Sequence, residues 1–249
     1  MPDRPDTWPA PSGRYPPGVE ETAQTLDRGL RLLQLVADAP GGLTVTEAAN
    51  RLGVGRSVVY RLAATLAMHG MIRRDDGGQL RIGAGVLHLA RRAQPLIADA
   101  TLPVLRRLAE QVGATAHLTV ADGAGQRPTG GPGLRDQAAP GEAVALAVVE
   151  PSWTALHVAY RAGSRHPLDH GAAGLAILAG RRGESGWVET NGQLQAGAYG
   201  IAAPVLGVPG LEASVGVVAL APLDAQVVGP AVIGAAAATA RALAPRTGN

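Results

Sequence analysis

Two short helical patterns separated by a tight turn, in residues 44–74, constrain the fold of this chain more than any other feature: TVTEAANRLGVGRSVVYRLAATLAMHGMIRR. Thr44 and Glu47 have the spacing of a capping box, in which each side chain satisfies a free N–H group at a helix start. Gly53 stands where a sharp turn needs a residue that tolerates positive φ. The second pattern keeps one apolar face, formed by Val59, Leu62 and Leu66. This spacing predicts a helix-turn-helix.

The segments on either side extend this motif. Upstream, an apolar stripe at helical spacing predicts a helix from about Glu21, made of Leu26, Leu30, Leu33 and Val36. Downstream, residues 71–74 and 80–82 read as two short strands around DDGGQ, and Asp-Gly between apolar flanks is a strong hairpin signal. A hairpin directly behind a helix-turn-helix is the wing of a winged-helix domain, here residues 21–83. Residues 1–20 contain six prolines and predict a disordered tail.

The charge of the chain is unevenly distributed. Every basic residue is arginine, and lysine and phenylalanine are absent, which by itself indicates a GC-rich genome rather than a partner. Residues 22–92 contain ten arginines and five acidic residues, a net charge of +5, whereas residues 93–249 contain ten and eleven, a net charge of −1. A basic N-terminal module joined to a near-neutral one is typical of a nucleic-acid binder with a second function.

Composition excludes several other classes of protein. The chain has no cysteine, so it has no disulfide, no cysteine-ligated zinc and no cysteine nucleophile. Its N-terminal residues lack the apolar core of a secretory signal, and its longest apolar runs are shorter than a membrane span. We therefore expect a cytoplasmic protein that needs neither a membrane nor a cofactor.

The second half of the chain changes to a mixed pattern. Residues 84–112 read as helical, and Pro95 and Pro103 predict breaks, hence a linker helix over 84–95 that could pair with its copy in a dimer, and then a separate helix. From residue 96 to 249 we expect a second domain with an antiparallel sheet. Its predicted strands are TAHLTVAD, EAVALAVVE, TALHVAYRAG, YGIAAPVLG and ASVGVVALAP, and its predicted helices cover residues 171–180 and 225–243. Residues 122–141 have no periodicity and predict a long mobile loop.

Three segments, taken in order, resemble the IclR-type bacterial transcriptional regulators. They are the helix-turn-helix region from Arg28 to Arg74, GSRHPLDHGAAGLAILAG and GQLQAGAYGIAAPV. The resemblance implies an α+β fold: an N-terminal winged helix-turn-helix joined by a linker helix to a GAF-like α/β effector domain with an antiparallel sheet. It implies a transcriptional regulator, not an enzyme, that binds double-stranded operator DNA. It also implies a small-molecule effector, an organic acid or an aromatic compound, and a homodimer or a dimer of dimers.

The helix after the turn should carry the DNA contacts. Because its apolar residues face the core, Arg56, Ser57, Tyr60 and Arg61 should face outward, near the helix end that reads bases. Arg61 fits a guanine edge, and Ser57 fits a base or a phosphate. Phosphate or minor-groove contacts are expected from Thr46, Arg56, Tyr60, Arg73, Arg74 and Arg81.

The resemblance also implies a ligand pocket in the second domain. Its candidate residues are Arg165, Ala173, Gly174, Gln193, Ile201, Ala202, Ala203, Val218 and Leu220. Arg165 is the candidate partner of a ligand carboxylate, since a guanidinium fork fits a planar anion. The chain departs from the family at Gln193, where an acidic residue is common, and at Val218 and Leu220, where some relatives have polar residues. These departures predict a more apolar pocket.

Three alternatives compete with this interpretation. The C-terminal domain, shortened after Gly180, could serve only to oligomerise the chain and bind no ligand. His166 and His170 are four residues apart, as in some metal pairs, but Pro167 disfavours a helix there and no third ligand is evident. A hydrolase built from Ser164, His166 and Asp169 is equally weak, because groups this close in sequence rarely point at one another.

Overall fold

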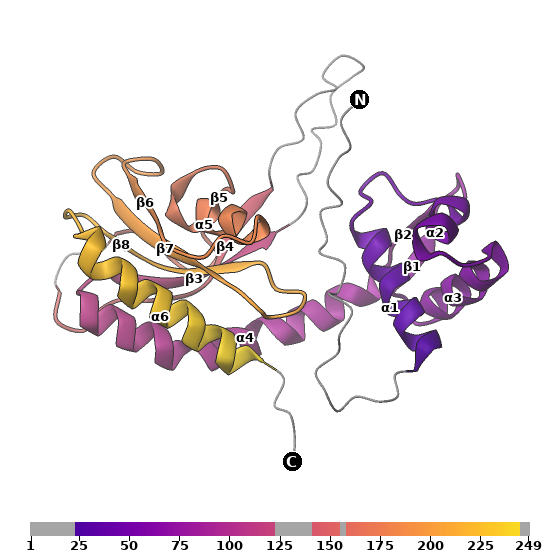
Figure 1. The fold of residues 1–249 in the computed structure, drawn as a ribbon, viewed down its shortest axis with the longest axis horizontal. Coiled ribbons are helices and arrows are strands. Elements are labelled where there is room, and N and C mark those ends of the chain that lie inside the picture. Colours follow the sequence, from indigo (N-terminus) through magenta and orange to yellow (C-terminus); the bar gives the residue numbers. More distant parts are fainter. Residues whose placement is uncertain (1–22, 123–140, 155–157, 245–249) are drawn as a thin grey trace, which may run out of the picture. The chain divides into compact units, whose positions relative to one another are not determined.

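The computed structural model of the chain describes residues 23–122, 141–154 and 158–244 (Figure 1). It divides into two compact units, residues 1–92 and 93–249. The predicted tail over residues 1–20 and nearly all of the predicted loop over 122–141 lie outside the described residues. The expected fold class is confirmed: a helix-turn-helix unit is followed by an α/β unit with an antiparallel sheet.

The first unit is a helix-turn-helix followed by a hairpin. Its elements are α1 Gln24–Ala37, α2 Val45–Leu52, α3 Arg56–Met68, β1 Ile72–Arg74 and β2 Leu80–Ile82. The predicted capping box is confirmed at α2, where the Thr44 hydroxyl accepts from the Glu47 N–H at 3.2 Å and the Glu47 carboxylate accepts from the Thr44 N–H at 2.9 Å. Gly53 ends α2 with a φ of +66°. The apolar faces of the helices and the hairpin share one core, which includes Leu32, Val36, Ala48, Val59, Leu62, Ile72 and Leu80.

The second unit is an antiparallel sheet with helices on both faces (Figure 1). Its elements after α4 are β3 Thr115–Asp122, β4 Glu142–Val149, β5 Arg165–Pro167, α5 Gly171–Arg181, β6 Val188–Asn191, β7 Tyr199–Val205, β8 Ala213–Ala219 and α6 Ala225–Leu243. The strand order is β5-β4-β3-β8-β7-β6, and all neighbouring strands are antiparallel. Four of the five predicted strands and both predicted helices therefore appear close to their expected bounds.

Strand alternation assigns the two faces of this sheet different roles. Alternate residues of β3, β7 and β8 pack with α6 and the end of α4 in the main core, and these include Leu118, Ile201, Ala203, Val215 and Val217. The intervening residues face α5: Ala202 packs with Ala172 and Ala176, and the Ser214 hydroxyl donates to the Ala173 carbonyl at 2.9 Å. Since side chains alternate along a strand, one face carries the core and the other is left for α5 and a pocket.

Helix α4 corrects the prediction of a linker helix that ends at residue 95. It runs from Gly85 to Val112 with both Pro95 and Pro103 inside. A proline in a helix costs roughly 3 kcal/mol, whereas a buried leucine contributes about 1.5–3 kcal/mol. Leu105 and Leu108 are buried against the sheet, which offsets the cost at Pro103. Pro95 is exposed, so water can reach the carbonyl that its ring leaves unpaired.

The strand predicted over residues 154–163 is also wrong in the part that the structure describes. Residues 158–164 contain a bend and a turn, and the strand that pairs with β4 is β5, Arg165–Pro167, which was not predicted as a strand. Val158 and Tyr160 instead line a pocket, together with Ala159 between them.

Helix α6 is long and apolar enough to cross a membrane by length and composition alone. One of its faces, however, packs on the sheet through buried Val228, Val232, Ala235 and Ala236. A helix that packs on a protein core can be as long and as apolar as a membrane span. The packing of α6 on the sheet therefore accounts for its apolar character.

Candidate nucleic-acid interface and ligand pocket

Helix α3 presents a polar face to solvent. Val59, Leu62 and Ala63 are buried against the rest of the first unit, which leaves the other side of the helix free. Four predicted DNA residues are exposed on α3, namely Arg56, Ser57, Tyr60 and Arg61, and a fifth, Thr46, is exposed in the first turn of α2. This face carries two cations and no acidic side chain in its first turn.

The hairpin adds charge next to this face. Arg73 and Arg74 are both exposed in β1. The guanidinium carbon of Arg74 lies 5.1 Å from the centre of the Tyr60 ring, within the range of a cation–π interaction. The structure thus brings together one predicted residue of the helix and one of the wing.

Arg81 is placed differently from the other predicted DNA residues. Its Nε donates to Asp75 Oδ2 at 2.6 Å, and its Nη1 donates to the Pro40 carbonyl at 3.1 Å. The Arg81 hydrogen bond, followed by one from the Gln79 N–H, holds the pKa of the Asp75 carboxyl below its usual value. Arg81 therefore braces the loop of the wing through Nε and Nη1.

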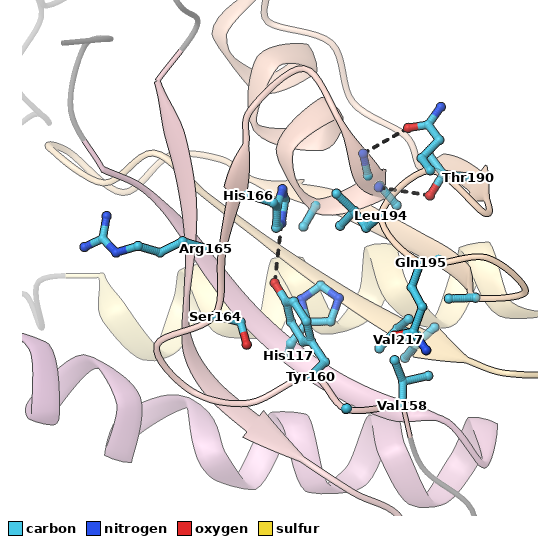
Figure 2. Close-up of a pocket in the computed structure, with 18 residues that line it drawn as sticks. His117, Val158, Tyr160, Ser164, Arg165, His166, Thr190, Leu194, Gln195 and Val217 are labelled. Atoms are coloured by element: carbon cyan, nitrogen blue, oxygen red, sulfur yellow. Dashed lines mark hydrogen bonds between the residues drawn. The ribbon is translucent and has the colours of Figure 1, made fainter. Parts of the chain in front are cut away.

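A cavity of about 280 Å³ lies in the second unit (Figure 2). Its wall is formed by the start of α5, the segment before β5, the loop after β6 and residues of strands β3, β5, β6, β7 and β8. Its polar lining residues are His117, Tyr160, Ser164, Arg165, His166, Thr190, Gln193 and Gln195. The volume is close to the lower end of small-molecule sites.

Side chains from the β6 end of the sheet cap the start of α5. Gln193 Oε1 accepts from the Gly171 N–H at 2.9 Å, and Thr190 Oγ1 accepts from the Ala172 N–H at 3.1 Å. Gly171 has a φ of +76°, and a Cβ there would lie 2.5 Å from Leu194 Cδ1. The helix start and the loop after β6 are therefore closely packed, and two free N–H groups of the helix are already bonded.

A chain of buried polar groups crosses the inner wall of the cavity. Its contacts are His117 Nδ1 to Thr119 Oγ1 at 3.1 Å, Thr119 Oγ1 to the Tyr160 hydroxyl at 3.3 Å, and that hydroxyl to His166 Nε2 at 3.5 Å. Burial, together with the nearby His166, lowers the pKa of His117 to about 3. Burial also raises the pKa of the Tyr160 hydroxyl. Both groups are therefore uncharged near neutral pH.

Arg165 lies at the cavity by position but its side chain points away (Figure 2). Its Nη1 donates to Asp122 Oδ2 at 2.6 Å and to Glu142 Oε2 at 2.8 Å. These two hydrogen bonds raise the pKa of the guanidinium above its ordinary value. Arg165 thus already has two carboxylate partners on the outer surface.

Residues 25–76 of the chain match the family model described as the IclR helix-turn-helix domain. This segment is an IclR-type helix-turn-helix domain. The chain is also similar to the acetate operon repressor of Salmonella typhimurium, with 33% identity over 122 residues that cover 46% of this chain and 44% of the relative. The regulator BhcR of Paracoccus denitrificans is 36% identical over 119 residues, which cover 43% of this chain and 39% of BhcR. The chain therefore spans less than half the length of the curated relatives it matches.

Among solved structures, the chain is similar to an IclR homolog from Microbacterium hydrocarbonoxydans complexed with 4-hydroxybenzoate. The identity is 18%, the TM-score is 0.47, and the match covers 88% of this chain and 98% of the homolog.

Outside the IclR-type domain, the predicted ligand residues fall into two groups. Four line the cavity: Arg165, Ala173, Gln193 and Val218. Five do not: Gly174, Ile201, Ala202, Ala203 and Leu220. Strand alternation turns Ile201 and Ala203 toward the α6 face. Ala202 is covered by α5, Gly174 approaches the Leu168 backbone, and Leu220 is exposed beyond the end of β8.

The sequence did not indicate the most buried polar residues of the pocket. His117, Tyr160 and Thr190 line it but were not predicted, and His166 was considered only for a metal pair or a hydrolase. The sequence offered one signal for His117. A histidine between apolar residues of a predicted strand indicates that its side chain lies on the less apolar face of the sheet. The proposed metal pair has no third ligand: among the described residues, no group of three or more histidine, aspartate or glutamate side chains could hold a metal.

Proposed function

We propose that the chain is a sequence-specific DNA-binding transcriptional regulator of the cytoplasm, whose C-terminal domain senses a small molecule and modulates operator binding. The DNA-binding domain is assigned to residues 21–83 and the effector domain to the chain from residue 96. The observation that carries the proposal is the exposed face of α3, with Tyr60 stacked under Arg74 of the wing, inside the segment that matches the IclR helix-turn-helix domain.

The contacts on DNA are proposed from this face. Arg61 and Ser57 read base edges, since both are exposed near the start of α3. Arg56, Tyr60, Thr46, Arg73 and Arg74 hold phosphates and set the register of the protein on the duplex. Arg81 supports the wing loop instead, because Asp75 and the Pro40 carbonyl already accept its hydrogen bonds.

The cavity in the second unit favours ligand sensing over a domain that only oligomerises. It is lined by polar groups from three separate stretches of the chain, at residues 117, 160–166 and 190–195, and a surface used only for packing copies together needs no such interior. A ligand shifts DNA affinity only if it binds two arrangements of the domains with different affinity. Helix α4 is the proposed carrier of that change, since Leu105 and Leu108 anchor it to the sheet behind the pocket.

The proposal includes a homodimer or a dimer of dimers. Three large apolar side chains are exposed on the first half of α4, with exposed fractions of 58% for Leu87, 55% for Leu89 and 69% for Leu96. Residues of this kind on a helix favour pairing with a second copy. Two copies would present two α3 helices to successive major grooves of a palindromic operator.

Selection from a random pool of duplex DNA on the full chain tests this function. A regulator enriches one motif with two related half-sites, and the Arg61→Ala variant enriches it less. A pool that stays random after repeated rounds, with the wild-type protein folded, contradicts sequence-specific binding. A screen for small molecules that raise the melting temperature tests the sensing domain separately.

A further inference from the structure

If each histidine ring carries one N–H, the polar chain beside the cavity has one direction in which all of its contacts, and that of His166 with Pro167, are hydrogen bonds. His166 Nδ1 lies 3.0 Å from the carbonyl oxygen of Pro167. A carbonyl oxygen can only accept, so Nδ1 of His166 carries the proton. A neutral imidazole has one N–H, so Nε2 of His166 is the acceptor.

This assignment fixes each following step. The Tyr160 hydroxyl must donate to His166 Nε2, so its oxygen accepts from the Thr119 hydroxyl. Because Thr119 has used its single proton, its oxygen accepts from Nδ1–H of His117. Nε2 of His117 is then left as a bare acceptor at the end of the chain.

That nitrogen is available to a ligand. Among the described residues, Nε2 of His117 has no hydrogen-bond partner, and it is not one of the polar atoms sealed in the interior. His117 lines the cavity, and its ring packs edge to face with the Tyr160 ring at 5.1 Å between centroids (Figure 2). An acceptor on the cavity wall that has no protein partner favours a molecule that brings a proton donor.

Two features that could bind an anion are already satisfied. Among the described residues that line the cavity, Arg165 alone has a permanent charge, and Asp122 and Glu142 hold its guanidinium outside the cavity. The first two N–H groups of α5 donate to Gln193 and Thr190. A carboxylate in the cavity would lose its hydration and meet an uncharged histidine lone pair, which is repulsive.

We propose that the pocket selects an uncharged ligand with a hydroxyl group, and that Nε2 of His117 accepts the hydrogen bond from that hydroxyl. The inference rests on the proposed sensing function and adds the ligand class and the residue that determines it. The volume of about 280 Å³ admits one substituted ring, since a cavity of about 150 Å³ holds benzene. His117, Thr119, Tyr160 and His166 together form the specificity chain.

Calorimetric titration of the full chain near neutral pH with phenol, anisole and benzoate tests the proposal. Anisole carries a methyl group in place of the hydroxyl proton of phenol, and benzoate adds the negative charge. Phenol should bind at one site, anisole should bind roughly tenfold more weakly because it leaves the nitrogen unpaired, and benzoate should not bind measurably. Equal binding of phenol and anisole, tighter binding of benzoate, or no binding of phenol overturns the proposal.

Two variants distinguish the role of His117 in ligand binding from that of Arg165. His117→Phe keeps a ring but removes the acceptor, so it should lose the preference for phenol over anisole. Arg165→Gln should leave all three affinities unchanged, because that side chain points outward. If benzoate binds and Arg165→Gln abolishes its binding, the cavity is an anion site instead.

A second measurement covers the case in which His117→Phe fails to fold. Nitrogen-15 spectra of the histidine rings in the wild-type chain should show His117 and His166 protonated at Nδ1 and bare at Nε2. A protonated Nε2 on His117 reverses the chain and overturns the proposal.

Operator binding, measured on the same preparations, distinguishes the two proposals. Specific DNA binding that responds to benzoate but not to phenol overturns the ligand class and leaves the regulator standing. If the wild-type chain binds phenol but shows no specific DNA binding either with or without phenol, the regulator is overturned and the pocket stands.

Discussion

Arg74 of β1 stacks on the ring of Tyr60 of α3, with 5.1 Å between the guanidinium carbon and the ring centre. The pair joins the wing to the helix that we propose as the DNA reader. Because Tyr60 is half exposed, the contact is worth roughly 0.5–1 kcal/mol. Its main consequence is that it holds the Arg74 guanidinium beside α3.

This pair predicts coupled effects on DNA affinity. Tyr60→Leu and Arg74→Ala should each weaken binding, and the double variant should weaken it by less than the sum, with a coupling of about 0.5–1 kcal/mol. Tyr60→Phe keeps the aromatic face and should keep the coupling with Arg74. The measurement is a double-mutant cycle by fluorescence anisotropy, and additive losses would show that the stacking is incidental.

Arg81 should act on the wing loop rather than on DNA directly. Arg81→Ala removes the hydrogen bonds to Asp75 and to the Pro40 carbonyl. The amides of Gly78 and Gln79, which bond to Asp75, should then exchange their hydrogens faster. Arg73→Ala is the matched control and should leave this exchange unchanged. Equal protection in both variants would mean that the loop holds its form without Arg81.

Two glycines in helices should respond oppositely to alanine. A Cβ at Gly174 would lie 2.4 Å from the Leu168 carbonyl oxygen, whereas a Cβ at Gly234 of α6 meets nothing within 4 Å. Gly174→Ala should destabilise the second unit by about 1–3 kcal/mol, and Gly234→Ala should stabilise it by roughly 0.5–1 kcal/mol. Thermal unfolding of the two variants checks both signs, and a neutral Gly174→Ala would contradict the close approach of α5 to Leu168.

The buried His117 predicts a pH dependence of stability. Its pKa is about 3 in the folded chain against an ordinary value of 6.5. Below about pH 6.5 the unfolded chain binds a proton at this ring and the folded chain does not, so stability falls as the pH decreases toward 3. One such group contributes a slope of about 1.4 kcal/mol per pH unit.

The measurement compares urea unfolding of the wild type and of His117→Phe across this range. The difference in the free energy of unfolding should shrink or reverse sign as the pH falls from neutral, because only the wild type pays for keeping His117 unprotonated. Parallel curves for the two proteins would show that His117 is protonated in the folded state as readily as in the unfolded one.

The helix-turn-helix could be predicted in detail because its signals are local. The Thr44–Glu47 capping box, the positive φ of Gly53 and the spacing of Val59 and Leu62 each act within a few residues. Helix α4 was predicted less well. The packing of Leu105 and Leu108 on a sheet formed by later residues outweighs the local effect of Pro103.

The pocket was harder to predict than α4, because its contacts join residues that are far apart in the sequence. Its polar chain joins His117, Tyr160 and His166 from segments up to about 50 residues apart, and no local pattern links them. Arg165 was predicted from its chemistry, but the positions of Asp122 and Glu142 decide where its side chain points. Strand alternation could have separated Ile201 from the pocket, but only once the face covered by α6 was known.

The most direct test of the account is an anisotropy titration of the full chain with its selected operator and with a scrambled duplex, at several salt concentrations. The wild type should prefer the operator, and its affinity should fall with salt because arginines displace counterions. Arg61→Ala should cost about 1–3 kcal/mol on the operator and little on the scrambled duplex, whereas Arg74→Ala should weaken both about equally. Equal wild-type affinity for the two duplexes at every salt concentration, or an Arg61→Ala variant that keeps full preference for the operator, would contradict α3 as the reader.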